Sequence, residues 1–190
     1  VERFLARFTD ILITINKEDY QRAQQFKAGK VVYIPGIGVD TNKFNVIRLD
    51  KNIKREELGI KNGTIVLLSI GEMIKRKNHE TAIRALAKLK KENVVYLICG
   101  RGKLENYLKE LAEKLGVGDK VKFLGFRNDI PEICKASDIF IFPSYQEGLP
   151  VAVMEAMAAG LPIICSNIRG NIDLIKNGQG GYLFEPRDVD

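Results

Sequence analysis

Beyond residue 63 the sequence alternates between short, continuous apolar runs and longer segments with helical spacing. The apolar runs predict strands at residues 64–70, 94–99, 120–124, 138–142, 162–166 and 181–184. The intervening segments predict helices at residues 79–91, 103–115, 129–136, 150–159 and 170–176. Runs this continuous are typical of strands buried on both faces. We therefore expect an α/β fold, a Rossmann-like parallel sheet with helices on both faces.

The first part of the chain has fewer elements. The pattern predicts strands at residues 9–15 and 31–34, with a helix between them that Asn16 caps and Gly29 ends. Residues 35–40 then form a turn-rich link.

Residues 45–63 are polar and charged, with one short helix expected around Arg55–Leu58, and they are the best candidate for a domain boundary. This divides the chain into residues 1–44, a linker at 45–63 and a main domain at 64–190. The sequence begins with Val1 and not with an initiator methionine, which suggests excision from a longer chain.

Composition limits the classes of partner. No apolar run approaches the roughly 20 residues of a membrane span, and the N-terminus does not resemble a signal peptide. The net charge of +6 suits an anionic small molecule, a membrane surface or simply lysines on solvated faces. Because the basic residues are not interleaved with aromatic ones, we do not expect nucleic-acid binding.

Metal-ligating and thiol residues are few. The cysteines Cys99, Cys134 and Cys165 show no Cys-x-x-Cys spacing, and we expect reduced, buried thiols of a cytoplasmic protein. His79 is the only histidine, which excludes a His-rich metal site, and we expect it to be structural. Residues 188–190 have the Asp-x-Asp form of metal-dependent sugar transferases but follow no strand, so no metal site is predicted.

The segment Ser144–Glu155 carries the strongest functional signal. It follows a strand-like apolar run, and Pro150 suits the first turn of a helix. That helix is apolar on every side except for Glu155, so it should be buried. With Glu147 in the preceding loop, two carboxylates bracket a helix N-terminus at the carboxyl end of a strand. Open α/β sheets bind ligands at that place.

Each group around this helix start suits a different part of a ligand. The N–H groups of Val151 and Ala152 can hold a diphosphate. Glu155 lies roughly 7 Å along the axis at ~1.5 Å per residue, where it can accept hydrogen bonds from a ribose. Glu147 can meet a sugar on the other side of the phosphates. The structural alternative for Glu155 is a buried ion pair with a lysine.

A second strand-to-helix junction should open onto the same crevice. Gly71 lets the backbone approach a ligand, and Asn78 can cap the following helix. Between them Lys75, Arg76 and Lys77 supply cations that suit a phosphate, although such a trio is often only solvated.

The third junction, Cys99-Gly100-Arg101-Gly102, resembles half of a dinucleotide-binding fingerprint. The third glycine is missing, and no acidic residue ends a strand about 20 positions further on. We therefore expect a tight turn with close packing, and no NAD binding.

These residues resemble those of the retaining family 4 glycosyltransferases, which have the GT-B architecture. The resemblance covers residues 60–190, the donor-nucleotide half. Glu147 and Glu155 stand in the family's Glu-x7-Glu spacing, within Phe142–Pro150 and Glu155–Pro162. The other matches fall in the expected order: Gly71 with Lys77, Gly100-Arg101-Gly102, Phe123-Leu124-Gly125-Phe126, and residues 9–44 as the end of the acceptor half.

The resemblance implies a role for each matching residue. Lys77 would neutralise the donor diphosphate beside Gly71 and Gly100, and Glu155 would bind the ribose diol. Glu147 is the expected catalytic residue. It would hold the transferred sugar together with the backbone of Gly148, Leu149, Pro150 and Val151.

The remaining matches concern the base and one departure from the family. The backbone around Phe126 and Arg127 would face the base. Where many members have an arginine after the glycine, this chain has Glu72, and Arg76 or Lys75 is expected to compensate.

The implied reaction is retaining transfer of a glycosyl unit from a UDP- or GDP-sugar to a glycan or lipid-linked acceptor, without a required metal or cofactor. The expected setting is polysaccharide biosynthesis in the cytoplasm, including the inner face of the membrane, with which the full-length protein would associate peripherally. Residues 64–190 would be the donor domain, truncated before its final helices. Residues 1–44 would end the acceptor domain and link the two. Alone, the chain would bind donor without efficient transfer.

Two other functions are compatible with the residues. One is a nucleotide-sugar binding module without transferase activity. The other is a glycoside hydrolase that uses Glu147 and Glu155 as an acid and nucleophile pair.

Overall fold

The computed structural model of the chain describes residues 2–45, 47, 50–89 and 91–190. Its main body is a six-stranded sheet in the order β5-β4-β3-β6-β7-β8, in which all neighbouring strands are parallel. The strands are β3 (Ile65–Ile70), β4 (Val94–Cys99), β5 (Val121–Gly125), β6 (Ile139–Phe142), β7 (Ile163–Ser166) and β8 (Gly181–Phe184). The predicted parallel α/β fold is confirmed, and each strand begins and ends within about one residue of its predicted place.

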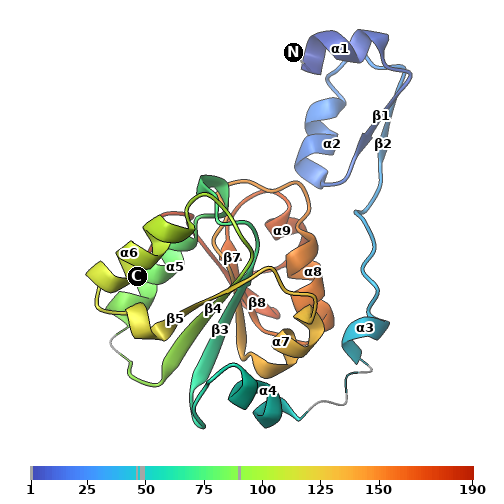
Figure 1. The fold of residues 1–190 in the computed structure, drawn as a ribbon. Helices are drawn as coiled ribbons and strands as arrows, with labels where there is room; N and C mark the ends of the chain where they lie inside the picture. The colour runs from blue at the N-terminus through green and yellow to red at the C-terminus, as the bar shows by residue number, and fades with distance from the viewer. Residues whose placement is uncertain (1, 46, 48–49, 90) are drawn as a thin grey trace.

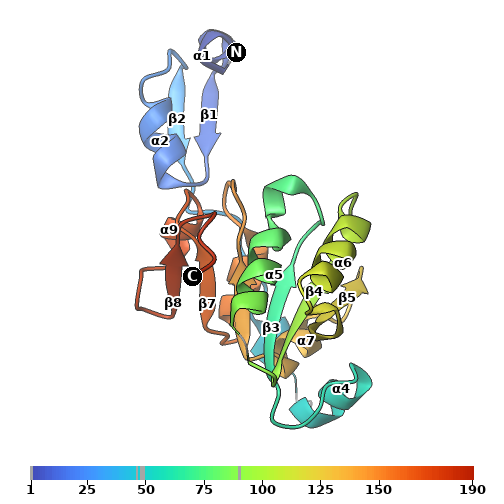
Figure 2. The same cartoon turned by 90° about the vertical axis from the view of Figure 1, so that its left-hand side faces the viewer.

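Helices cover both faces of this sheet, as predicted. In Figure 1, α5 (His79–Lys88) and α6 (Glu105–Lys114) lie on one side. On the other side lie α7 (Ile130–Ala136), α8 (Val151–Ala158) and α9 (Asn171–Leu174), and Figure 2 shows α5 and α6 from the front.

Several helix ends differ from the prediction. Predicted helix 79–91 ends at Lys88, and residue 90 lies outside the described residues. Predicted helix 103–115 starts at Glu105 because the N–H of Leu104 donates to the carbonyl of Met73, 2.9 Å away, which holds the turn before it. Predicted helix 170–176 ends at Leu174, because Ile175 has an extended backbone.

Side chains along the central strands point alternately to the two faces of the sheet, and this divides the core into two layers. β4 is buried at every position, as a strand with helices on both faces should be. Its residues Val95, Leu97 and Cys99 pack in the layer of α7 and α8, whereas Tyr96 and Ile98 pack in the layer of α5 and α6.

The cysteines are core residues. Cys99, Cys134 and Cys165 are free and buried, as predicted. Burial raises the pKa of each thiol to about 12, because the apolar surroundings disfavour the thiolate. These thiols are therefore packing groups and not nucleophiles.

A small N-terminal unit extends from the main body (Figure 1). It contains α1 (Glu2–Leu5), the 3₁₀ turn η1 (Ala6–Phe8), β1 (Ile11–Thr14), α2 (Lys17–Ala23) and β2 (Lys30–Tyr33). β1 and β2 pair in parallel. Asn16 caps α2 as predicted, but the helix ends at Ala23, well before Gly29.

Two short helices, α3 (Asn42–Asn45) and α4 (Lys51–Glu57), connect this unit to the main body. The expected helix at Arg55–Leu58 begins earlier, because the side chain of Asp50 accepts the N–H of Asn52. The predicted linker 45–63 includes residues 46, 48 and 49, which lie outside the described residues.

Arg55 ties α4 to the main body. Its guanidinium is buried and donates to the carbonyl of Ala136 (2.8 Å) and to the carboxylate of Asp138 (2.6 Å). The carboxylate of Asp138 also accepts the N–H of Val66 (2.8 Å), at the start of β3. Helix α4 is therefore attached at the amino ends of β3 and β6, opposite the edge that carries the predicted site.

Candidate functional site

The predicted site residues lie near the point where the order of the strands across the sheet reverses direction. β3 has β4 on one side and β6 on the other, so the loops after β3 and β6 meet at the carboxyl edge. The N–H of Tyr145 donates to the carbonyl of Arg76 (2.8 Å), which joins the two loops. Such a switch point is the usual ligand crevice of an open α/β sheet.

Asn78 strengthens this junction in a way that the sequence did not indicate. It occupies the N-cap position of α5, but its side chain makes no capping bond, so that prediction was wrong in detail. Its backbone is left-handed (φ 53°), and its buried amide donates to the carbonyls of Pro143 (2.9 Å) and Pro186 (2.8 Å). Asn78 thus fastens the cationic turn η2 (Lys75–Lys77) to the loop after β6.

The predicted cations and one predicted carboxylate hold each other. Oε1 of Glu147 accepts from Nζ of Lys77 (2.8 Å) and from Nη1 of Arg76 (3.0 Å). Nζ of Lys77 also lies 4.8 Å from the centre of the Phe142 ring. Glu147 is buried, with 8% of its surface exposed, so its charge depends on these two partners.

The start of α8 offers donors beside this cluster. Pro150 is the N-cap, one residue earlier than the predicted first-turn position, because its backbone is extended (ψ 112°). Its carbonyl accepts the N–H groups of Val153 and Met154, whereas the N–H groups of Val151 and Ala152 have no backbone acceptor in the described part of the chain. A helix start with exposed N–H groups favours an anion.

Glu155 lies one turn further along α8 and is half-buried. Burial raises the pKa of its carboxyl, and the charge of Lys43 on α3 offsets only part of this. Among the described residues Glu155 has no ion pair, so the lysine partner expected under the structural alternative belongs instead to Glu147.

The glycines after β3 and β4 lie where two backbone segments approach each other closely. Gly100 has φ +147°, and a Cβ there would lie only 2.0 Å from the carbonyl oxygen of Gly71. A Cβ on Gly102 would lie 2.4 Å from the carbonyl oxygen of Met73. The expected tight turn is present, and it brings the loops after β3 and β4 together at the site.

Phe126 and Arg127 follow β5 at the same edge of the sheet. Phe126 is exposed, whereas the guanidinium of Arg127 pairs with Asp129 (2.7 Å) and reaches Glu57 (3.3 Å). Arg127 holds the pKa of the Asp129 carboxyl well below its usual range. The side chain of Arg127 is therefore engaged with acids, and only its backbone is available for the role that the sequence predicted.

His79 is buried behind the site. Its Nδ1 lies 3.3 Å from the hydroxyl of Tyr96, which donates to Oγ of Ser69 (2.7 Å). Burial lowers the pKa of His79 to about 4, so the ring is neutral at physiological pH. This placement fits the structural role expected for His79.

The loop that carries Glu147 has a partner that sequence reasoning missed. Nδ2 of Asn16 donates to the carbonyl of Gly148 (3.1 Å), although the two residues are far apart in the sequence. The pattern around Asn16 indicated a helix cap and gave no signal for this second contact.

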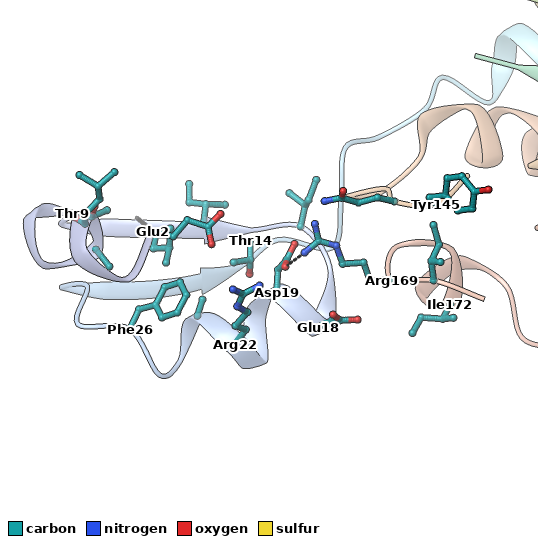
Figure 3. Close-up of a pocket in the computed structure, with 18 of the residues that line it drawn as sticks. Glu2, Thr9, Thr14, Glu18, Asp19, Arg22, Phe26, Tyr145, Arg169 and Ile172 are labelled. Carbon is teal, nitrogen blue, oxygen red and sulfur yellow. Dashed lines mark hydrogen bonds and ion pairs between the residues drawn. The ribbon is translucent and has the colours of Figure 1, made fainter. Parts of the chain in front are cut away.

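A large cavity in the described part of the chain lies elsewhere. A space of about 960 Å³ separates the N-terminal unit from the main body (Figure 3), and an ion pair between Asp19 and Arg169 crosses it. Tyr145 and Gln146 line this space, but Lys77, Glu147 and Glu155 do not. The charged cluster therefore adjoins the cavity without forming it.

None of the helices in the described residues has the length and apolar character needed to cross a membrane.

Comparison with known proteins gives a consistent result. The family described as "Glycosyl transferases group 1" matches residues 50–190. EpsD of Bacillus subtilis is 37% identical over 99% of this chain and 51% of its own length. An Escherichia coli protein, UDP-Gal:alpha-D-GlcNAc-diphosphoundecaprenol alpha-1,3-galactosyltransferase, is 36% identical over 100% of this chain and 51% of its own length.

A solved structure extends the comparison to the fold. The crystal structure of Anabaena HepE in complex with UDP and glucose matches with a TM-score of 0.87 and 27% identity. The match covers 97% of this chain and 52% of HepE. The present chain thus spans about half the length of the relatives that it matches.

Proposed function

This chain belongs to the group 1 glycosyltransferases, and from that membership we propose that its main body binds the nucleotide-diphosphate sugar donor of a glycosyl transfer. The observation that carries the proposal is the pairing of Glu147 with Lys77 and Arg76 beside the start of α8. A dianionic diphosphate can take the place of the Glu147 carboxylate beside these cations. It can also accept hydrogen bonds from the free N–H groups at the start of the helix.

Each part of the donor then has its own groups. Lys77, Arg76 and the N–H groups at the start of α8 bind the diphosphate, and the backbone at Gly71 and Gly100 lets it approach closely. Glu155 accepts the ribose hydroxyls. The backbone at Phe126 and Arg127 faces the base. The cation that replaces the family's missing arginine is Arg76, because it already pairs with Glu147, whereas none of the ion pairs among the described residues involves Lys75.

Donor binding would change the partner of Glu147. When the diphosphate takes over Lys77 and Arg76, Glu147 becomes available to the hydroxyls of the transferred sugar, together with the backbone of Gly148 to Val151. During transfer the bond between the anomeric carbon and the β-phosphate oxygen breaks, the oxygen of an acceptor hydroxyl bonds to that carbon with retained configuration, and the hydroxyl proton passes to the leaving diphosphate. The same cations stabilise the negative charge that develops on the leaving diphosphate, which removes the need for a metal.

The acceptor is proposed from the relatives. The Escherichia coli galactosyltransferase is named for a diphosphoundecaprenol-linked sugar. We infer a glycan or lipid-linked acceptor for the present protein, in polysaccharide synthesis at the cytoplasmic side of a membrane. Positioning that acceptor would require the part of the relatives that this chain does not span, so the chain alone should transfer little.

The hydrolase alternative has less support. A hydrolase needs both carboxylates at one sugar ring, but Glu147 is directed to Lys77 and Arg76. A binding module without transferase activity would have the same donor site, and an assay of transfer by a protein that also contains the part of the relatives not spanned here would separate it from an enzyme.

A titration panel tests the proposal. We expect the chain to bind at least one of UDP, GDP and UDP-glucose with a Kd in the micromolar to millimolar range, measured by calorimetry, and with no loss in EDTA. Absence of heat and of NMR shift changes with all three would contradict a donor site. Turnover of a nitrophenyl glycoside would favour the hydrolase.

The two carboxylates should respond differently to substitution. Glu155→Ala removes charge-assisted bonds to ribose worth about 1.5–3 kcal/mol, so UDP affinity should fall roughly 10- to 100-fold. Glu147→Ala removes the competitor for Lys77 and Arg76, so the affinity for UDP without a sugar should hold or rise. Equal losses in calorimetric titrations with UDP would refute these assignments.

A further inference from the structure

The loop that carries Glu147 is held from the N-terminal unit by Asn16. This side chain is wholly buried and uses both ends of its amide. Its Oδ1 accepts the N–H of Asp19 (2.8 Å) and so caps α2. Its Nδ2 donates to Oδ2 of Asp19 (2.7 Å) and to the carbonyl of Gly148 (3.1 Å). One neutral side chain therefore connects the start of α2 to the residue after Glu147.

Other groups close around the same loop. A Cβ on Gly170 would lie 2.4 Å from the carbonyl oxygen of Gly148, and a Cβ on Gly36 would lie 2.1 Å from Cδ2 of Leu149. Nη1 of Arg76 donates to the carbonyl of Gln146 (2.9 Å). The carbonyl of Gly148 is thus fixed by a hydrogen bond and by close packing. Because a peptide group is planar, this also fixes the direction of the N–H of Leu149.

Among the described residues, the other polar contacts between the two units do not touch this loop directly. The N–H of Lys17 donates to Oδ2 of Asp173 (2.9 Å), and its Nζ lies 3.8 Å from Oδ1 of that residue. Asp19 pairs with Arg169. The Lys17–Asp173 pair has a largely exposed lysine and contributes little by itself. The part-buried Asp19–Arg169 pair lies next to Gly170, which packs against Gly148, so only the Lys17–Asp173 pair is independent of the loop.

We propose that Asn16 is a positioning residue for the sugar end of the donor. It sets the Gly148–Leu149 peptide group and, through it, the place of Glu147, so the N-terminal unit completes the sugar site of the main body. This inference rests on the proposed donor function. It concerns the transferred sugar and not the nucleotide, because Lys77 and Glu155 have no contact with Asn16.

The test separates the capping role of Asn16 from its contact with Gly148. Asn16→Ser retains a good helix cap, but its hydroxyl is too short to reach the Gly148 carbonyl. Asp173→Ala is the matched control, because it removes a contact between the units that does not touch the loop. Thermal melts of both variants check that they are folded.

The first readout needs no ligand. In ¹H–¹⁵N spectra of the free protein, Asn16→Ser should shift the amide signal of Leu149, whose peptide group loses a hydrogen bond, and Asp173→Ala should leave it in place. The second readout is the ratio of the affinities for UDP-glucose and UDP. We expect Asn16→Ser to lower this ratio about 3- to 10-fold, the loss of one hydrogen bond, with less than about a 2-fold change for UDP.

Each unexpected result would contradict a different part of the proposal. An unmoved Leu149 signal, or equal losses for UDP and UDP-glucose, would overturn the positioning role, as would the same ratio change in Asp173→Ala. A wild-type protein that binds neither ligand would overturn the proposed function and with it the sugar role. A Leu149 shift in that case would leave Asn16 as a tether between the units and nothing more.

Discussion

Replacing Lys77 with alanine is expected to weaken UDP binding about 10- to 100-fold, because a charge-assisted bond to a phosphate contributes about 1.5–3 kcal/mol. Lys77 is the cation best placed for this. Its side chain is 14% exposed, against 44% for Arg76, and its methylenes pack against Gly71. Because the ammonium of Lys77 is partly buried, water and salt screen its attraction to a phosphate less than they would screen that of an exposed ammonium.

Lys75 supplies the matched control. It belongs to the same 3₁₀ turn but is exposed, and none of the ion pairs in the described part of the chain involves it. Lys75→Ala should change UDP affinity by less than about 2-fold, as is usual for an exposed charge. Calorimetric titration of both variants measures the difference. If the two substitutions cost the same, the cations act only as a diffuse positive surface, and the assigned role of Lys77 is wrong.

Gly100→Ala should have the largest effect on stability, a loss of at least about 3 kcal/mol. Two costs add: an L-residue at φ +147° is strained, and a Cβ placed 2.0 Å from the carbonyl oxygen of Gly71 forces two backbones apart. Because the loops after β3 and β4 would separate, UDP binding should fall as well.

Gly116 provides a control for the backbone strain alone. It has φ +69°, and its Cβ position is open within 4 Å. Gly116→Ala should therefore cost only about 1–2 kcal/mol, the penalty for a left-handed alanine. Urea unfolding followed by circular dichroism gives both values. Equal destabilisation by the two substitutions would show that the contact between Gly100 and Gly71 is not tight in solution.

The sequence allowed the sheet and the local arrangement of the site to be predicted, because both depend on short-range patterns. The continuous apolar run at Val94–Cys99 is a strand buried on both faces, and the apolar segment after Pro150 is helix α8. Asn16 shows the limit of such patterns. Its role as a helix cap could be read from neighbouring residues, whereas its bond to Gly148 depends on how two distant segments meet.

The same limit applies to charge. Sequence reasoning assigned Lys77 to a phosphate and Glu147 to a sugar, and it considered a lysine partner only for Glu155. It did not foresee that Lys77 and Glu147 would pair with each other, because the loops after β3 and β6 are about 70 residues apart in the chain and meet only through the strand order. Helix α2 ends at Ala23 and not at the nearest glycine, because the N–H groups of Gln25 and Phe26 donate to the carbonyls of Arg22 and Ala23 in a tighter turn.

Under the proposed function, the pairing of Glu147 with Lys77 and Arg76 would affect release of the product. If the donor binds as proposed, Glu147 would lose the sugar hydroxyls once the sugar has left and would again compete with the diphosphate for the same cations. A nucleoside-diphosphate product would therefore be opposed by a carboxylate that the intact donor would satisfy, so the proposed site would retain substrate more tightly than product. One ion pair that keeps a buried carboxylate neutralised before binding would in this way promote release of the product afterwards.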